Sequence, residues 1–220
     1  MTASDKRATS MAEGYDEEAE ASVWLAPEVA FGLAYAHIKP GQSVLDVGIG
    51  TGLGSILFHK AGLHVHGMDI SRDMLDACQS KGFAADLQQH DLCVTPYPYG
   101  TGCMDHAVCV GVFQFFEDLS PVFREVARIV RDAGLFVLAV ADRGPREEGR
   151  MILGAEHTHS SAQVTMYRHS PEQIQGWLEE SGFCLERSLE FIMYMDREQT
   201  RRLRAMAYVA RRSVASPAAV

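Results

Sequence analysis

The sequence lacks a long apolar run. Of its 220 residues, 47% are hydrophobic and 22% charged, and glycine or charge breaks every apolar stretch short of the roughly 20 residues that a membrane helix needs. The first 20 residues, MTASDKRATSMAEGYDEEAE, hold no apolar segment, so neither a signal peptide nor a membrane anchor is expected. The hydrophobic content still allows a continuous core, which excludes a disordered or fibrous chain. We expect a soluble, cytoplasmic protein.

Cysteine is scarce, and the sequence contains no C-x-x-C pair. The five cysteines are odd in number and scattered, whereas a disulfide framework needs even, clustered cysteines. They are therefore interpreted as reduced thiols, as in the cytosol. No metal site is expected, because His157-x-His159 has no third ligand nearby and His64-x-His66 falls on a strand predicted to be buried.

Positive charge is also in short supply. Twenty Lys and Arg face 29 Asp and Glu, a net charge of −9, and an acidic protein repels a phosphate backbone. Nucleic acid is therefore not an expected partner. The exception is the segment after Asp196, which carries six arginines. A solvated face is the simplest interpretation of this segment, and a patch that binds an anion or RNA is the alternative.

Short apolar segments alternate with helical patterns from residue 43 onward. Strands are predicted over residues 43–47, 64–68, 83–90, 104–110 and 135–141. Strands that are apolar on both faces suit a parallel sheet covered by helices, and repeated strand–helix units indicate a doubly wound sheet. Two further extended segments, 183–191 and about 204–211, are interpreted as a hairpin-like pair at the sheet edge, although the second could be a helix.

Helix boundaries follow from a few residues. Pro27 interrupts the first helical pattern, so two short helices are predicted before residue 40. Ser120 is expected to be an N-cap before Pro121, with Gly134 ending that helix. Ser170 and Gln173 are placed to form a capping box.

The predicted fold is α/β: a doubly wound, mostly parallel seven-stranded sheet with helices on both faces and an antiparallel edge strand. Residues 1–40 are expected to form a tail and cap helices, and residues 41–220 the main domain. A lid-like insertion is predicted over about 143–170, where charge, glycine and histidine gather.

The strongest chemical signal is a glycine turn of the form D-x-G-x-G-x-G, built from Asp46, Gly48, Gly50 and Gly52. Such a turn lets backbone approach a ligand closely, and a helix start behind it offers free N–H groups. The turn does not fit the dinucleotide fingerprint G-x-G-x-x-G, and the sequence has no P-loop G-K-[ST].

This turn resembles that of the class I S-adenosylmethionine-dependent methyltransferases, and the resemblance extends from about residue 15 to residue 212. It implies S-adenosyl-L-methionine as cofactor. It also implies that Asp46 lies near the amino group of the ligand, and that Asp69, followed by Ile70, binds the ribose hydroxyls. A carboxylate suits the ribose because it can accept two hydrogen bonds. The alternative for Asp69 is a helix N-cap, a part that Ser71 could also fill.

The resemblance further implies contacts to the two ends of the cofactor. Asp91 and Leu92 match the pair that holds the adenine, and Gly111 and Val112 match the backbone that faces the methionine part. Tyr15, with Asp16, resembles a Tyr-Asp pair on an N-terminal segment that folds over the cofactor. A plain turn residue is the alternative for Asp91, and a strand terminator for Gly111.

Two features depart from the family pattern. The family usually has Pro-Gly-Gly before the fifth strand, where this chain has Asp132-Ala133-Gly134. No substrate-defining motif such as Asn-Pro-Pro-Tyr is present, so the acceptor and the methylated atom are left open. Phe113 and Tyr167 are candidates for substrate contact, and His157 or His159 for a general base.

The resemblance therefore implies a methyltransferase that acts on a small molecule. The alternatives are an RNA or protein methyltransferase that docks through its arginine-rich segment, and a non-catalytic protein that binds S-adenosylmethionine. The expected partners are a small-molecule acceptor and, as an open alternative, a second copy of the chain in a homodimer, with no membrane.

Overall fold

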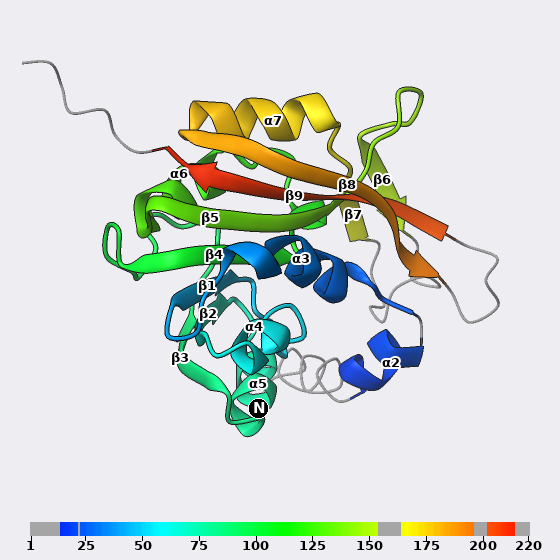
Figure 1. Ribbon diagram of the computed structural model, residues 1–220. Coiled ribbons are helices and arrows are strands. Elements are labelled where there is room, and N and C mark those ends of the chain that lie inside the picture. The colour runs from blue at the N-terminus through cyan, green and yellow to red at the C-terminus, as the bar shows by residue number, and fades with distance from the viewer. Residues whose placement is uncertain (1–13, 22, 154–163, 196–201, 214–220) are drawn as a thin grey trace, which may run out of the picture.

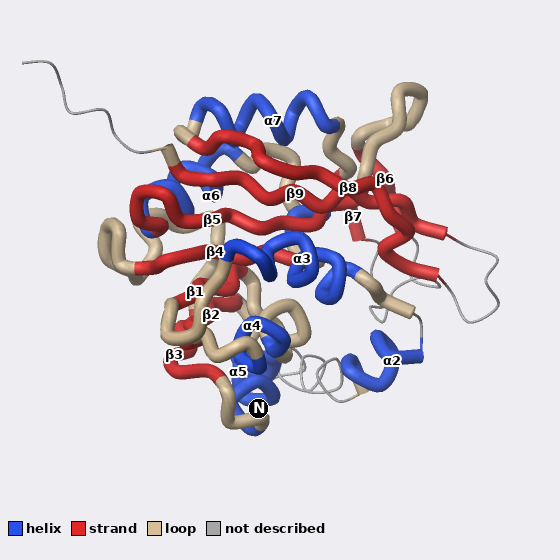
Figure 2. Tube along the Cα trace, viewed as in Figure 1, coloured by secondary structure: helices blue, strands red, loops and turns tan. Residues whose placement is uncertain are grey.

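The computed structural model describes residues 14–21, 23–153, 164–195 and 202–213. Its centre is one seven-stranded sheet in the order β3-β2-β1-β4-β5-β9-β8 (Figures 1 and 2). The first five strands in the chain are parallel to one another, and their bounds are Ser43–Val47 (β1), His64–Asp69 (β2), Ala84–Gln89 (β3), Met104–Val110 (β4) and Val130–Ala141 (β5). The order reverses between β1 and β4, which is where open α/β sheets bind ligands.

Two long strands complete the sheet. Strands β8 (Phe183–Met195) and β9 (Arg202–Arg212) pair antiparallel, and β9 pairs antiparallel with β5. The predicted seven-stranded sheet with an antiparallel pair at its edge is confirmed, and the second segment of the pair is a strand rather than a helix. Because β9 inserts between β5 and β8, the reversed strand lies one position inside the edge.

Helices cover both faces of the sheet, as a doubly wound fold requires. Helices α3 (Ala26–Ala34), α4 (Ile56–Lys60) and α5 (Arg72–Ser80) contribute to one buried apolar cluster. Helices α6 (Ser120–Ile129) and α7 (Pro171–Glu180) contribute to the other. Figure 1 shows α3 in front of the sheet, with α6 and α7 toward the upper edge. The core therefore consists of two layers, separated by the central strands β1, β4 and β5, most of whose residues are buried.

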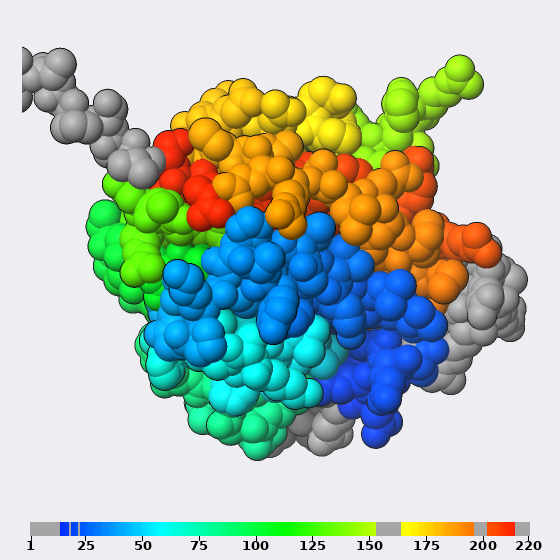
Figure 3. Space-filling model, in the orientation of Figure 1, coloured from blue at the N-terminus to red at the C-terminus, as the bar shows by residue number. Residues whose placement is uncertain are grey.

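The N-terminal segment forms two helices, as predicted. Helix α2 (Tyr15–Ala21) is followed by α3, in whose first turn Pro27 lies, and a short 3-10 turn η1 (Tyr35–His37) follows α3. The backbone N–H of Leu25 donates a 3.0 Å hydrogen bond to the carbonyl of Met193. This bond fixes the segment between the two helices to β8, and Figure 3 shows the N-terminal helices packed below that strand.

Two predicted helix boundaries differ from the structure. Ser120 is inside α6 and not its N-cap, since its own N–H and hydroxyl both donate to Asp118 at 2.9 Å. The helix ends at Ile129 rather than at Gly134, because Val130 already pairs with β4. Gly134 instead lies in an irregular part of β5, where a Cβ would be 2.2 Å from the carbonyl oxygen of Asp105. The capping box of Ser170 and Gln173 is confirmed.

The predicted insertion contains a small sheet that the sequence did not indicate. Strands β6 (Arg150–Leu153) and β7 (Val164–Tyr167) pair antiparallel beyond the end of β5. His157 and His159 lie outside the described residues. On β2, the expected burial of both histidines is wrong, because His64 is exposed and His66 is half-buried. None of the helices in the described ranges is long and apolar enough to cross a membrane.

The arginine-rich end of β9 is not simply a solvated face. Arg212 donates to the carbonyls of Ala127 and Gly182 at 3.0 and 2.9 Å. Arg211 pairs with Glu186 and donates to the carbonyl of Ala133 at 2.8 Å. These two side chains therefore bind the protein's own backbone and carboxylates.

Candidate functional site

The glycine turn follows β1 and leads toward helix α4. Gly48 and Ile49 donate backbone hydrogen bonds of 2.8 and 3.0 Å to the carbonyl of Met68, which fixes the turn to β2. Gly52 has a φ of +94°, and a Cβ there would lie 2.4 Å from the ring of Phe83. Gly50 has a φ of +54° but no atom within 4 Å of a Cβ position. Gly52 is therefore required for packing, whereas Gly50 leaves open space at the turn.

Asp69 closes the turn from the end of β2. One carboxylate oxygen accepts a 2.9 Å hydrogen bond from the N–H of Gly50, and the other accepts one of the same length from Ser71. The N-cap of α5 is Ser71, whose hydroxyl accepts from the N–H of Met74 at 3.3 Å. Asp69 is thus not the N-cap of the helix, and it joins the glycine turn to the start of α5.

Asp46 is a carboxylate at the base of the turn. It is only 2% exposed, and its Oδ2 has no hydrogen-bond partner among the described residues. Burial, together with the nearby charge of Asp69, raises the pKa of Asp46 to about 7. A buried, unsatisfied carboxylate is costly unless a ligand completes it, so Asp46 is suited to receive a hydrogen-bond donor or a cation.

These residues surround a cavity of about 650 Å³ at the carboxyl ends of β1, β2 and β4. Ten of the eleven predicted cofactor-binding residues line it: Tyr15, Asp46, Gly48, Gly50, Asp69, Ile70, Asp91, Leu92, Gly111 and Val112. The exception is Gly52, which faces Phe83 and Cys78 instead. The structure therefore brings residues from five separate segments of the chain to one cavity.

The predicted substrate residues do not line this cavity. Phe113 is fully buried and packs its ring against those of Phe123 and Phe136. The short 3-10 turn η2 (Phe113–Phe115) directs the next two aromatics, Phe115 and Phe116, to the cavity in its place. Tyr167 is half-buried on β7, opposite Arg150.

Sequence reasoning missed several wall residues. Trp24 lines the cavity from the segment between α2 and α3, and lies so close to Gly111 that a Cβ there would be 2.9 Å from its ring. Gln114 lines the cavity as well, and its side-chain amide donates to the carbonyl of Gly111 at 2.7 Å. Of these three residues, only Gly111 could be predicted from the sequence. Neither Trp24 nor Gln114 belongs to a recognisable motif.

Helix α2 is bound to the glycine turn. The hydroxyl of Thr51 donates to Asp16, whose other carboxylate oxygen pairs with Lys81 after α5. Tyr15, the neighbour of Asp16, is thereby placed on the cavity wall. The Tyr-Asp pair singled out in the sequence lies beside the glycine turn.

Known proteins share this fold. The family model described as "Methyltransferase domain" matches residues 45–138, which hold the glycine turn, Asp69, Asp91 and Gly111. A solved S-adenosylmethionine-dependent methyltransferase from Methanosarcina mazei has the same fold, with a TM-score of 0.71 at 14% identity over 83% of this chain and 97% of that one. Residues 45–138 match a methyltransferase domain.

Two further proteins resemble this chain. A ubiquinone biosynthesis O-methyltransferase from Aeromonas salmonicida is 27% identical over 120 residues, which are 53% of this chain and 50% of that protein. The magnesium protoporphyrin IX methyltransferase of Synechocystis, solved with bound SAH, has a TM-score of 0.62 at 21% identity over 86% of this chain and 81% of that one. The chain spans about half the length of the curated relatives that it matches.

Proposed function

We propose that this chain is an S-adenosylmethionine-dependent methyltransferase that transfers a methyl group to a small-molecule acceptor. The observation that carries the proposal is the pair of carboxylates at one cavity: Asp69, which touches Gly50, and Asp46, whose buried Oδ2 has no partner among the described residues. The names of the similar proteins, an O-methyltransferase and a methyltransferase with bound SAH, support the same function.

The residues present fit the cofactor. We assign the ribose hydroxyls to Asp69 beside Ile70, and the adenine to Asp91 and Leu92. The open space at Gly50 admits the close approach of a ligand to backbone. The four residues assigned to the ribose and the adenine line the cavity on the side of β2 and β3.

The methionine end is assigned to the other side of the cavity. The amino group would meet the unpartnered oxygen of Asp46, and the methionine chain would pass Gly111 and Val112 at the end of β4. Tyr15 would cover the cofactor from α2. Burial raises the pKa of Asp46, and a cationic partner would stabilise its ionised form.

The cofactor, when bound, supplies a methyl group on a sulfonium, which is already an activated leaving group. The protein then has to align the acceptor and exclude water. Trp24, Phe115 and Phe116 supply apolar surface for this at the cavity. The acceptor atom is undetermined, and the candidate bases His157 and His159 lie outside the described residues.

Further features of the proposal concern the whole protein. We propose a cytoplasmic location, no membrane or nucleic-acid partner, a homodimer as an open alternative, and a division into an N-terminal cap, residues 1–40, and a methyltransferase domain, residues 41–220. Arg211 and Arg212 bind backbone carbonyls, which leaves less of the arginine-rich segment for docking RNA.

The test is calorimetric titration with S-adenosylmethionine and S-adenosylhomocysteine, followed by a screen for labelled-methyl transfer to a metabolite panel. We expect micromolar binding of both, and transfer to at least one small acceptor. Binding without transfer to any small, RNA or protein acceptor would favour the non-catalytic alternative, and transfer to RNA or protein alone would favour the macromolecular one. Absence of any binding would refute the assignment.

A further inference from the structure

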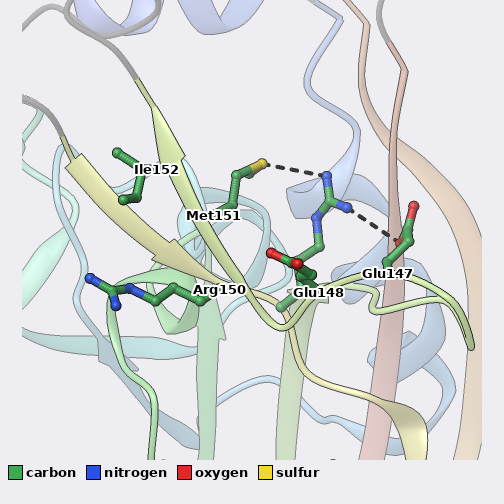
Figure 4. Close-up of a pocket in the computed structure, with 6 residues that line it drawn as sticks. Glu147, Glu148, Arg150, Met151 and Ile152 are labelled. Carbon is green, nitrogen blue, oxygen red and sulfur yellow. Dashed lines mark hydrogen bonds and ion pairs between the residues drawn. The ribbon is translucent and has the colours of Figure 1, made fainter.

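A second cavity lies beside the β6–β7 sheet. It has a volume of about 640 Å³ and shares no lining residue with the first, its walls being Glu147, Glu148, Arg150, Met151, Ile152 and Arg168 (Figure 4). Met151 is half-buried and Ile152 is 55% exposed, so part of the wall is apolar. The cavity therefore combines charged groups with hydrocarbon surface.

The guanidinium of Arg168, at this cavity, has N–H donors without a close hydrogen-bond partner in the described part of the chain. Its side chain is only 22% exposed, and one terminal nitrogen lies 3.3 Å from Glu147. The other terminal nitrogen lies 3.7 Å from the sulfur of Met151 (Figure 4). The Nε is buried and has no hydrogen-bond partner in the described part of the chain. A guanidinium has five N–H donors, and its charge-assisted bonds are about 2.7–2.9 Å long, so these contacts leave Arg168 unsatisfied.

Glu147 pairs with Arg168 only loosely, at 3.3 Å. The same oxygen, Oε2, accepts a 2.9 Å hydrogen bond from the N–H of Gly144 and lies 3.6 Å from a nitrogen of Arg204. One carboxylate oxygen thus faces two guanidinium groups, at distances longer than a tight ion pair. Glu148 and Arg150 also line the cavity, and Asp142 lies 3.9 Å from the same nitrogen of Arg204. Arg168 is the loosely paired cation on the cavity wall, and an additional oxyanion would bind there.

The second cavity lies close to the wall of the first. His169, the residue after Arg168, has its ring Nε2 3.0 Å from the carbonyl of Phe116, which lines the first cavity. Strand β7 also contacts η2. Figure 1 shows β6 and β7 at the same end of the sheet as α2. A ligand held by Arg168 is therefore on the side of the molecule where the acceptor must enter.

We propose that Arg168 determines specificity by binding an oxyanion, a carboxylate or a phosphate, on the acceptor. Its guanidinium takes the oxyanion in two parallel hydrogen bonds, Met151 and Ile152 contact the adjoining hydrocarbon, and the atom to be methylated extends toward Phe116. This inference rests on the proposed function and names the substrate class as an amphiphilic anion.

Direct binding tests the inference without knowledge of the natural acceptor. Decanoate, decyl phosphate and decanamide are titrated into the protein saturated with S-adenosylhomocysteine. We expect the better of the two anions to bind roughly tenfold or more tightly than the neutral amide, since hydrogen bonds to a charged group are of that strength. The anion that binds better distinguishes a carboxylate from a phosphate. Equal binding of all three probes would overturn the inference, and this comparison needs no variant.

Variants then assign the preference to Arg168. Arg168→Met should remove the advantage of the anions over the amide, and Arg168→Lys should keep part of it. Arg187→Met removes an equal charge from the exposed face of β8 and should leave the preference intact. An unchanged preference in Arg168→Met would contradict the assignment. Failure of S-adenosylhomocysteine itself to bind would refute the proposed function instead, and the two failures are therefore distinguishable.

Discussion

The hydroxyl of Thr51 donates a 2.6 Å hydrogen bond to the carboxylate of Asp16, and so ties helix α2 to the glycine turn. The ion pair of Asp16 with Lys81 holds the helix from a second side. Tyr15, which lines the cavity, is carried by this helix. One carboxylate thus joins the helix that carries Tyr15 to two other parts of the chain.

Replacing this carboxylate should speed the release of cofactor. Asp16→Ala removes both the hydrogen bond and the ion pair, and we expect S-adenosylhomocysteine to dissociate about three- to tenfold faster, in proportion to roughly 1 kcal/mol of lost interaction. Stopped-flow displacement measures the rate. Glu17→Ala, on the exposed side of the same helix, should leave it unchanged. Equal rates in the wild type and Asp16→Ala would show that α2 does not retain the ligand.

Asp69 should contribute strongly to affinity. We expect Asp69→Ala to weaken binding of S-adenosylhomocysteine by roughly 1.5–3 kcal/mol, the scale of hydrogen bonds to a charged group. Asp69→Asn should retain part of the affinity, because the amide oxygen can still accept from Gly50. Asp76→Ala, on the exposed side of α5, is the matched control. Calorimetry that finds unchanged affinity in Asp69→Ala would remove this residue from the site.

The two glycines of the turn should respond differently to the same added methyl group. Gly52→Ala places a Cβ 2.4 Å from Phe83, and overpacking of this kind costs about 1–3 kcal/mol of unfolding free energy. Gly50→Ala meets no neighbouring atom, so its cost to stability is limited to the strain of a side chain at a φ of +54°. Its methyl group enters the space that the ligand needs. We expect urea unfolding to detect mainly the first variant and calorimetric titration mainly the second. Normal affinity in a folded Gly50→Ala protein would contradict the close approach of ligand to this backbone.

Binding should depend on pH through Asp46. Because the pKa of this carboxyl is raised from 3.8 to about 7 by burial and by Asp69, the folded protein holds a proton that the unfolded chain releases. The stability of the unliganded protein should therefore fall as the pH rises from about 4 to 7. A cationic amino group requires the ionised carboxylate, so affinity should rise with pH and level off above 7, being about tenfold weaker one pH unit below the pKa.

Asp46→Asn isolates this dependence. The variant should bind more weakly at pH 8 and show little change in affinity between pH 5.5 and 8. Calorimetry in two buffers of different ionisation enthalpy should also detect proton release on binding to the wild type at pH 6. A pH profile that is the same in both proteins would assign the titration to another group.

Arg212 should act on stability and not on the reaction. Its contacts to Ala127 and Gly182 place a cation at the carboxyl ends of α6 and α7, where the helix dipole favours positive charge. We expect Arg212→Met to lower the unfolding free energy by about 1–3 kcal/mol, with unchanged affinity for the cofactor. Arg202→Met, exposed on the same strand, should have little effect. A stable Arg212→Met protein that had lost affinity for RNA would instead support the docking alternative.

The parts of the fold that could be predicted are those fixed by local pattern. Strands β1 and β4 and the second half of β5 are mostly apolar, and the capping box at Ser170 and the turn after Asp46 have their own residue signatures. The end of α6 could not be predicted, because the pairing of Val130 with β4, a contact distant in sequence, overrides the helical pattern up to Gly134.

The site divides in the same way. Residues at strand ends, such as Asp46 and Asp69, could be found because the carboxyl ends of parallel strands meet at one edge. Trp24 could not, since its position depends on how the N-terminal segment crosses the sheet. Phe113 was assigned to the substrate because it follows β4, but the 3-10 turn points it into the core and brings Phe115 and Phe116 to the surface in its place.

The position of Trp24 has a consequence for the order of assembly. This residue emerges early from the ribosome, yet its ring packs on Gly111 and the next residue, Leu25, bonds to Met193. The first contact needs about the first half of the 220-residue chain, and the second needs β8, which ends at Met195. The bond of Leu25 is therefore lost if β8 separates from the sheet. Nucleation can therefore proceed around the central strands, while a binding-competent pocket has to wait for the last strands to dock.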